Sequence, residues 1–240
     1  MTNNEFIKQI AAAALKYYTT YKILPSLTIA QACLESGWGK TGLAKDCNNF
    51  FGMKWTSSCG TDCKEYSTRE QKKDGTWYTI KAKFRKYPTV ADGIKGYYDF
   101  LSYARYKNLK GITDYREACT TIKEDGWATD VSYTQKLKEM VQAYELWRYD
   151  LQAIYPKGPL GNITPDTNFL AIVWLQTQLN THLTGIKDFL PLKVDGDYGA
   201  KTRAAVLLYW KLLGWNIEGK NTGWTVGVKT KTALIAGRKK

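Results

Sequence analysis

Apolar side chains return every three or four positions in several separate stretches of the chain. Over residues 4–19 this spacing predicts an amphipathic helix. Pro25 precedes a second helix that is expected to run to Glu35, with Ser26 as its N-cap. The same pattern predicts further helices over residues 90–104, 115–123, 133–147, 169–183, 201–213 and 228–236.

One stretch departs from this helical pattern. Residues 77–84 alternate between apolar and polar side chains, as a half-buried strand does. The preceding Lys72-Lys73-Asp74-Gly75 is a turn signal, so we expect a β-hairpin here. A single hairpin among many helices predicts an α+β class that is mostly helical.

Prolines and glycines gather between Tyr155 and Pro165, where three prolines and two glycines fall in a short stretch. Such a composition is typical of a linker. The sequence therefore predicts a first domain over residues 1–155, a linker over 156–166 and a small three-helix domain over 167–240.

The charge is strongly basic, with 35 Lys and Arg against 22 Asp and Glu, and a net charge of +13. This balance indicates an anionic partner, which is nucleic acid, an acidic membrane or an anionic wall polymer. No nucleic-acid fold motif accompanies the basic residues, so nucleic acid ranks last among these partners. No segment approaches 18 consecutive apolar residues, so we expect no membrane insertion. The 17 Tyr and 9 Trp can fill cores or stack against sugar rings or bases.

The N-terminus lacks the pattern of a secretory signal, and the five cysteines are an odd number. Both features suit synthesis in a reducing cytosol. Cys59 and Cys63 are spaced for a disulfide or, with Cys47, a loose metal site, but free thiols are the preferred interpretation. The only histidine, His182, lies far from these cysteines. We expect no metal and no cofactor.

The most informative segment is Ala30-Gln31-Ala32-Cys33-Leu34-Glu35-Ser36-Gly37-Trp38-Gly39, followed by Asn48-Asn49-Phe50-Phe51-Gly52. It places Glu35 near the end of an apolar helix, on the same face as Thr28 and Gln31. A carboxyl group held against apolar surface is harder to ionise and can carry a proton at neutral pH, as a general acid must. The alternative is an ordinary surface glutamate near a helix end, and spacing alone leaves both interpretations open.

These two motifs resemble the peptidoglycan glucosaminidases of glycoside hydrolase family 73. The resemblance continues through Lys81–Tyr87, Gly126–Tyr133 and, more weakly, Leu146–Asp150, so it covers roughly residues 5–150 in the order of the family. It implies a lysozyme-like, mostly helical fold whose small β-hairpin lobe faces a cleft. It also implies hydrolysis of the β-1,4 bond after N-acetylglucosamine in the wall glycan.

The resemblance assigns three catalytic residues. The general acid falls on Glu35, and the second carboxylate falls on the hairpin, where Glu70 fits the threonine-bearing run better than Glu65 does. The tyrosine of the last motif falls on Tyr133. The mechanism stays open: Glu70 close to the substrate would activate water and invert the anomeric centre, whereas a distant Glu70 would leave the substrate's acetamide as nucleophile, with retention.

The matching motifs also imply substrate-binding residues, which are Asn49, Phe51, Tyr87 and Trp127. The sequence departs from the family at Trp127, where tyrosine is usual, and at Val131, where proline is usual. These departures concern one wall of the expected cleft. The rival activities on such a scaffold are a muramidase and a lytic transglycosylase, and the rival class is a non-catalytic wall-binding protein.

The last part of the chain resembles the helical peptidoglycan-binding domain family, through Leu175–Asn180 and Val194–Val206. Asp195-Gly196 and Gly199 are interpreted there as a turn and a helix entry. A catalytic domain joined to a wall-binding domain is similar to a phage endolysin. The expected partners are bacterial peptidoglycan and anionic wall polymers. The expected location is the host cytoplasm, with action at the wall after release.

Overall fold

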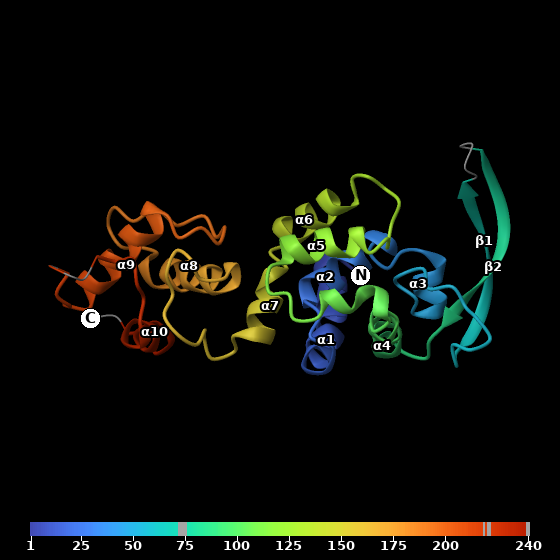
Figure 1. Ribbon diagram of the computed structural model, residues 1–240, viewed down its shortest axis with the longest axis horizontal. Helices are drawn as coiled ribbons and strands as arrows, with labels where there is room; N and C mark the ends of the chain where they lie inside the picture. Colours follow the sequence, from blue (N-terminus) through green and yellow to red (C-terminus); the bar gives the residue numbers. More distant parts are fainter. Residues whose placement is uncertain (72–75, 218, 220–221, 239–240) are drawn as a thin grey trace. The chain divides into compact units, whose positions relative to one another are not determined.

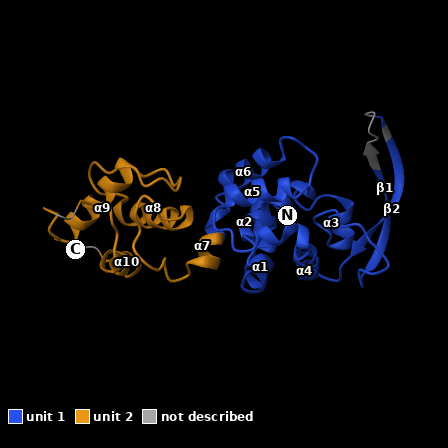
Figure 2. Cartoon of the chain, viewed as in Figure 1, with its two compact units in different colours: residues 1–149 blue, residues 150–240 orange. Residues whose placement is uncertain are grey.

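The structure is a computed structural model that describes the chain except for residues 72–75, 218, 220–221 and 239–240, together with the side chains of residues 69–71 and 77. The chain forms two compact units, Met1–Tyr149 and Asp150–Lys240 (Figure 2). In the part of the chain that is described, no helix has the length and apolar character needed to cross a membrane.

The first unit is mainly helical (Figure 1). Its elements in chain order are α1 (Asn3–Tyr21), α2 (Pro25–Glu35), α3 (Gly42–Cys47), β1 (Asp62–Gln71), β2 (Trp77–Lys86), α4 (Val90–Leu101), the 3₁₀ helix η1 (Ala104–Leu109), α5 (Tyr115–Glu124), α6 (Tyr133–Ala143) and the start of α7 (Trp147–Ile154). The single helix predicted over 133–147 is wrong, because the backbone at Glu145 has a φ of 49°. A left-handed residue cannot continue a right-handed helix, so α6 and α7 are separate.

Helix α2 is the central element of this unit. Its residues from Pro25 to Cys33 are all buried, as expected for a helix covered on every side. It packs against α1, α5 and α6. Ser26 is not the N-cap, because the helix starts one residue earlier with Pro25 at its first position, where a missing N–H costs nothing.

The hairpin is anchored to α3 through one end. Strands β1 and β2 are antiparallel and pair from Asp62 with Lys86 to Gln71 with Trp77. The Tyr66 hydroxyl donates to the Asp46 carboxylate at 2.9 Å and lies 3.2 Å from the Gly42 carbonyl. Figure 1 shows the hairpin standing beside α3. The predicted turn at residues 72–75 lies outside the described residues.

The second unit has its own apolar core. Helices α8 (Phe169–Leu183), α9 (Ala200–Leu212) and α10 (Val228–Ile235) surround it. Its fully or nearly fully buried side chains include Leu175, Leu179, Val206, Tyr209 and Val226. The mostly helical α+β class with one two-stranded hairpin is thus confirmed for the described residues.

The units divide after Tyr149, earlier than the boundary predicted after residue 155. The reason is that Leu151 and Tyr155 pack against the core of the second unit. The predicted linker also contributes to that unit, since Ile163 is fully buried and forms a β-bridge with Val226. The buried Lys231 ammonium donates to the carbonyls of Pro159 and Gly161, which ties the same segment to α10.

The five cysteines all lie in the described part of the chain, and none of them forms a disulfide. Cys33, Cys47 and Cys119 are buried in the first unit, whereas Cys59 and Cys63 are half-buried. Burial raises the pKa of Cys33 to about 12.

Candidate active site

Glu35 is the last residue of α2, directly before a sharp turn. The Ser36 hydroxyl donates to the Ala32 carbonyl and accepts from the Gly39 amide at 2.7 Å, which closes the helix end. Gly37 and Trp38 have φ values of 54° and 63°, so the chain leaves the helix at once. A side chain at Gly39 would come within 2.6 Å of the Phe6 ring, which is why this position needs glycine.

Two hydrogen-bond donors, from Tyr133 and Trp127, fix the Glu35 carboxylate. The Tyr133 hydroxyl donates to Glu35 Oε1 at 2.6 Å, and Trp127 Nε1 donates to the same oxygen at 3.1 Å. Within the described residues no hydrogen bond is made to Oε2. The carboxylate therefore has one held oxygen and one oxygen available for a ligand.

Behind Glu35 lies a buried chain of hydrogen bonds. The Tyr97 hydroxyl donates to Gln31 Oε1 at 2.5 Å, and Gln31 Nε2 donates to the Tyr133 oxygen at 3.0 Å. Because an amide nitrogen only donates, the Tyr133 oxygen accepts from Gln31 and its own proton is directed to Glu35. The network thus sets the direction of the Tyr133–Glu35 bond.

The two tyrosines of this network, Tyr133 and Tyr97, stay protonated. Burial, and then the nearby Glu35 carboxylate, raise the pKa of Tyr133 above its ordinary value. Burial also raises the pKa of Tyr97. A phenol that keeps its proton can act as a hydrogen-bond donor over the whole working pH range.

Aromatic rings support the two donors. Trp127 meets Tyr97, Phe100 and Tyr106 in edge-on contacts with ring centroids 5.6, 5.9 and 6.2 Å away. Phe51 stacks on Tyr97 with centroids 3.9 Å apart. This packing holds the Trp127 indole in position to donate.

A pocket of about 420 Å³ opens in front of the carboxylate. It is lined by Leu34, Glu35, Tyr133, Lys136 and the segment 127–130. An ion pair of 2.7 Å between Lys136 and Asp130 braces this wall. The pocket brings an acid, a phenol, an indole and a cation to one place, which suits general acid catalysis on a polar substrate.

Of the predicted substrate contacts, only Trp127 lies at this pocket. Asn49 is 2% exposed, and its amide holds its own loop by bonding the backbone of Met53 and the Arg85 carbonyl. Phe51 and Tyr87 are each 5% exposed and pack inside the unit. In the structure these three side chains support the fold around the site, and their contact with a substrate stays a prediction.

The structure describes the side chain of only one of the two candidate hairpin glutamates, Glu65. Glu70 pairs with Tyr78 in the hairpin, and its side chain lies outside the described residues. Glu65 is exposed and faces Lys81 at 3.5 Å. The predicted catalytic role of Glu70 stays a prediction.

Sequence reasoning gave no role to Gln31 or Tyr97. Gln31 is fully buried, and its position one turn before Glu35 in an apolar helix was the available signal. A polar side chain at such a position needs a partner, and here it has two. Within the described chain, no group of three or more His, Cys, Asp or Glu side chains is arranged to hold a metal ion.

Comparisons with known proteins agree on the family of the first unit. The family model described as glucosaminidase, mannosyl-glycoprotein endo-beta-N-acetylglucosaminidase, matches residues 11–146. The exo-glucosaminidase LytG of Bacillus subtilis is 36% identical over 153 residues, which cover 60% of this chain and 52% of LytG. The chain thus spans about half the length of that relative.

Two solved structures have a similar fold. The catalytic domain of the autolysin Auto from Listeria monocytogenes is 31% identical with a TM-score of 0.56, and the match covers 61% of this chain and 86% of that one. The truncated glycoside hydrolase domain of FlgJ from Salmonella typhimurium is 28% identical with a TM-score of 0.51, over 60% of this chain and 98% of that one. The expected likeness to this group of hydrolase folds is confirmed for the first unit.

Proposed function

Because the chain belongs to the glucosaminidase family, we propose that it is a peptidoglycan hydrolase that cleaves the β-1,4 bond between N-acetylglucosamine and N-acetylmuramic acid within the glycan. The observation that carries this proposal is the Glu35 carboxylate at the mouth of a pocket, with Tyr133 and Trp127 both bonded to one of its oxygens. The related proteins named as glucosaminidase and autolysin support the same substrate.

Glu35 acts in this proposal as the general acid. Its Oε2 carries the proton to the leaving oxygen of the glycan, since Oε1 is occupied by two donors. Once the proton has left, those two donors stabilise the carboxylate that remains. Tyr133 thus contributes by holding the acid in place and by keeping its hydrogen bond to the carboxylate after transfer.

Glu70 is proposed as the second carboxylate, because it lies in the threonine-bearing run ahead of strand β2. Glu65, the alternative on the hairpin, is exposed and faces Lys81 at 3.5 Å. Strand geometry places position 70 about 13 Å beyond Tyr66, so a movement of the hairpin would change its distance from Glu35. Inversion and substrate-assisted retention both remain open to such a site.

The second unit is proposed to bind the cell wall. From Pro156 to Lys240 the chain has twelve basic and five acidic residues, which favours anionic wall polymers. We also propose an endolysin role, in which the enzyme accumulates in the host cytoplasm and reaches the wall after the membrane is breached. Expression inside a host with and without a membrane-permeabilising agent tests that role, and lysis without the agent would contradict it.

The decisive experiment is digestion of purified peptidoglycan followed by mass spectrometry of the products. N-acetylglucosamine at the new reducing end supports the proposal. A muramic acid reducing end would indicate a muramidase, and an anhydromuramic end a transglycosylase. The Glu35→Gln variant is expected to fold normally and to lose about 10²–10⁴-fold in activity, the usual contribution of general acid catalysis. Turnover near that of the wild type would remove Glu35 from the mechanism.

A further inference from the structure

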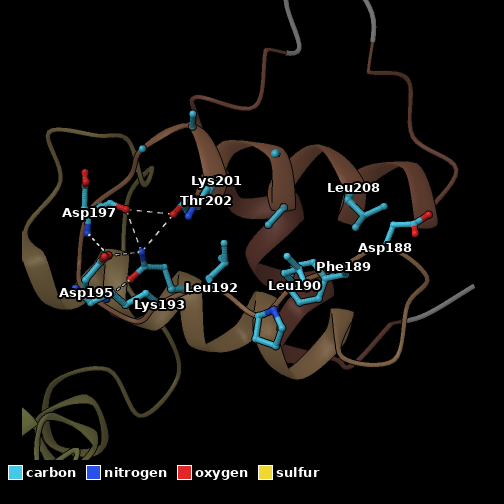
Figure 3. Close-up of a pocket in the computed structure, with 16 residues that line it drawn as sticks. Asp188, Phe189, Leu190, Leu192, Lys193, Asp195, Asp197, Lys201, Thr202 and Leu208 are labelled. Atoms are coloured by element: carbon cyan, nitrogen blue, oxygen red, sulfur yellow. Dashed lines mark hydrogen bonds between the residues drawn. The ribbon is translucent and has the colours of Figure 1, made fainter. Parts of the chain in front are cut away.

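A second pocket lies in the second unit, and none of its lining residues is assigned to catalysis. It has a volume of about 710 Å³ and opens between the segment 188–197 and helix α9 (Figure 3). Ala204, Ala205 and Leu208 of α9 form its floor. Nothing in the proposed reaction uses this pocket.

The wall of the pocket is a loop without helix or strand, but it is firmly held. The Asn180 side chain makes two bonds to the backbone of Leu192, at 2.7 and 2.8 Å. One turn earlier on α8, the buried Gln176 accepts from the amides of Asp195 and Gly196 and donates to the Asp195 carboxylate at 2.9 Å. A side chain at Gly196, where φ is 71°, would overlap the Phe169 ring, so the turn is fixed as expected from the sequence. The pocket is therefore preformed.

The pocket is lined by carboxylates, although residues 156–240 as a whole are basic. Only five acidic residues occur between Pro156 and Lys240, and three of them, Asp188, Asp195 and Asp197, line this one pocket. Figure 3 shows Asp195 and Asp197 together at one end and Asp188 at the other. Among the described residues, none of the three forms an ion pair. Carboxylates gathered on a basic module indicate a cationic ligand group.

Apolar side chains lie between the two acidic ends. Phe189, Leu192, Ala205 and Leu208 line the middle of the pocket, and Leu190 at its edge is 84% exposed. A ligand that matches this pattern has an alkyl chain ending in an ammonium group. Lys193 and Lys201 also line the pocket and offer cations for a carboxylate of the same ligand.

We propose that this pocket binds the free side-chain ammonium of the diamino acid in an uncrosslinked peptidoglycan stem peptide. The alkyl stem of that residue lies on the apolar floor, and its ammonium meets Asp195 Oδ2 and the exposed Asp197. The peptide carboxylates meet Lys193 and Lys201. This proposal rests on the proposed wall-binding role of the second unit, and it names the ligand of that role.

Calorimetric titration of the full chain tests the proposal, with Glu35→Gln present so that no glycan is cut. The probe is the tripeptide L-Ala-γ-D-Glu-L-Lys, and the comparison is the same peptide acetylated on its side-chain nitrogen. We expect acetylation and Asp197→Asn each to weaken binding about five- to tenfold. The matched control is Asp166→Asn, which makes the same charge change at an exposed position outside the pocket and should leave binding unchanged.

A second variant blocks the pocket without changing a residue of the loop. Ala204→Trp changes an exposed residue of α9 and fills the floor, so it should abolish titration while the protein keeps its unfolding midpoint. The proposal would be overturned if neither peptide gave heat on titration. It would also be overturned if the free and the acetylated peptide bound with equal affinity. Sedimentation with intact walls is measured separately: walls that retain a chain unable to bind the tripeptide would leave the wall-binding role standing and refute only this ligand.

Discussion

Removal of one hydroxyl group, by Tyr133→Phe, tests the network that holds the catalytic acid. The change deletes the donor 2.6 Å from Glu35 Oε1 and leaves Trp127 at 3.1 Å as the remaining donor. It also removes the acceptor of Gln31 Nε2, which lies in a fully buried side chain. The variant should therefore lose both activity and stability.

The loss of activity and the loss of stability can be estimated separately. A hydrogen bond to a charged group contributes about 1.5–3 kcal/mol, which corresponds to about 10- to 150-fold in rate. Because Trp127 still bonds the same oxygen, we expect the lower part of this range, about 10- to 50-fold in kcat. A buried donor without a partner costs about 1–3 kcal/mol, so the free energy of unfolding should fall by that amount.

The assay is release of reducing sugar from soluble wall fragments, combined with urea unfolding of each variant. Tyr98→Phe is the matched control, because the Tyr98 hydroxyl is also fully buried and lies 2.8 Å from Thr28 Oγ1, without contact to Glu35. This control should lose stability and keep kcat. If Tyr133→Phe lowers kcat no more than Tyr98→Phe does, the network serves the fold alone and our account of Glu35 is wrong.

Three other expectations can be checked directly. Glu70→Gln should impair wall hydrolysis more than Glu65→Gln does, and the reverse order would show that the wrong hairpin residue was chosen. Residues 1–149 alone should cleave soluble fragments at the full rate but digest intact walls more slowly, since the second unit raises the local concentration of enzyme. Residues 150–240 should sediment with walls, less so as salt rises. The pKa of Cys33 is raised by burial to about 12 from an ordinary value of 9, so its thiolate forms first in the unfolded chain. Stability from this group is complete below pH 9 and is lost between pH 9 and 12, so the Cys33→Ala variant should show a shallower decline over that range in urea unfolding.

The sequence determined the elements and the chemistry that local patterns encode. Helical periodicity and alternation depend only on neighbouring residues, which is why most helices and the hairpin were predicted within a few residues. The turn after Glu35 also follows from local residues, because glycines permit the backbone angles it needs. The break at Glu145 was missed, since no glycine or proline marks it.

Only the tertiary structure decided which side chains meet. Gln31, Tyr97, Trp127 and Tyr133 come from four different segments, and their hydrogen bonds around Glu35 depend on how α2, α4 and α6 pack. The same packing buried Asn49, Phe51 and Tyr87, which a motif alone had presented as substrate contacts. In the second unit, carboxylates spaced along the chain line one pocket. The side-chain amides of Gln176 and Asn180 on α8 hold the backbone of the loop that carries these carboxylates. Burial and long-range hydrogen bonds arise only when the chain is folded, so no local pattern could specify them.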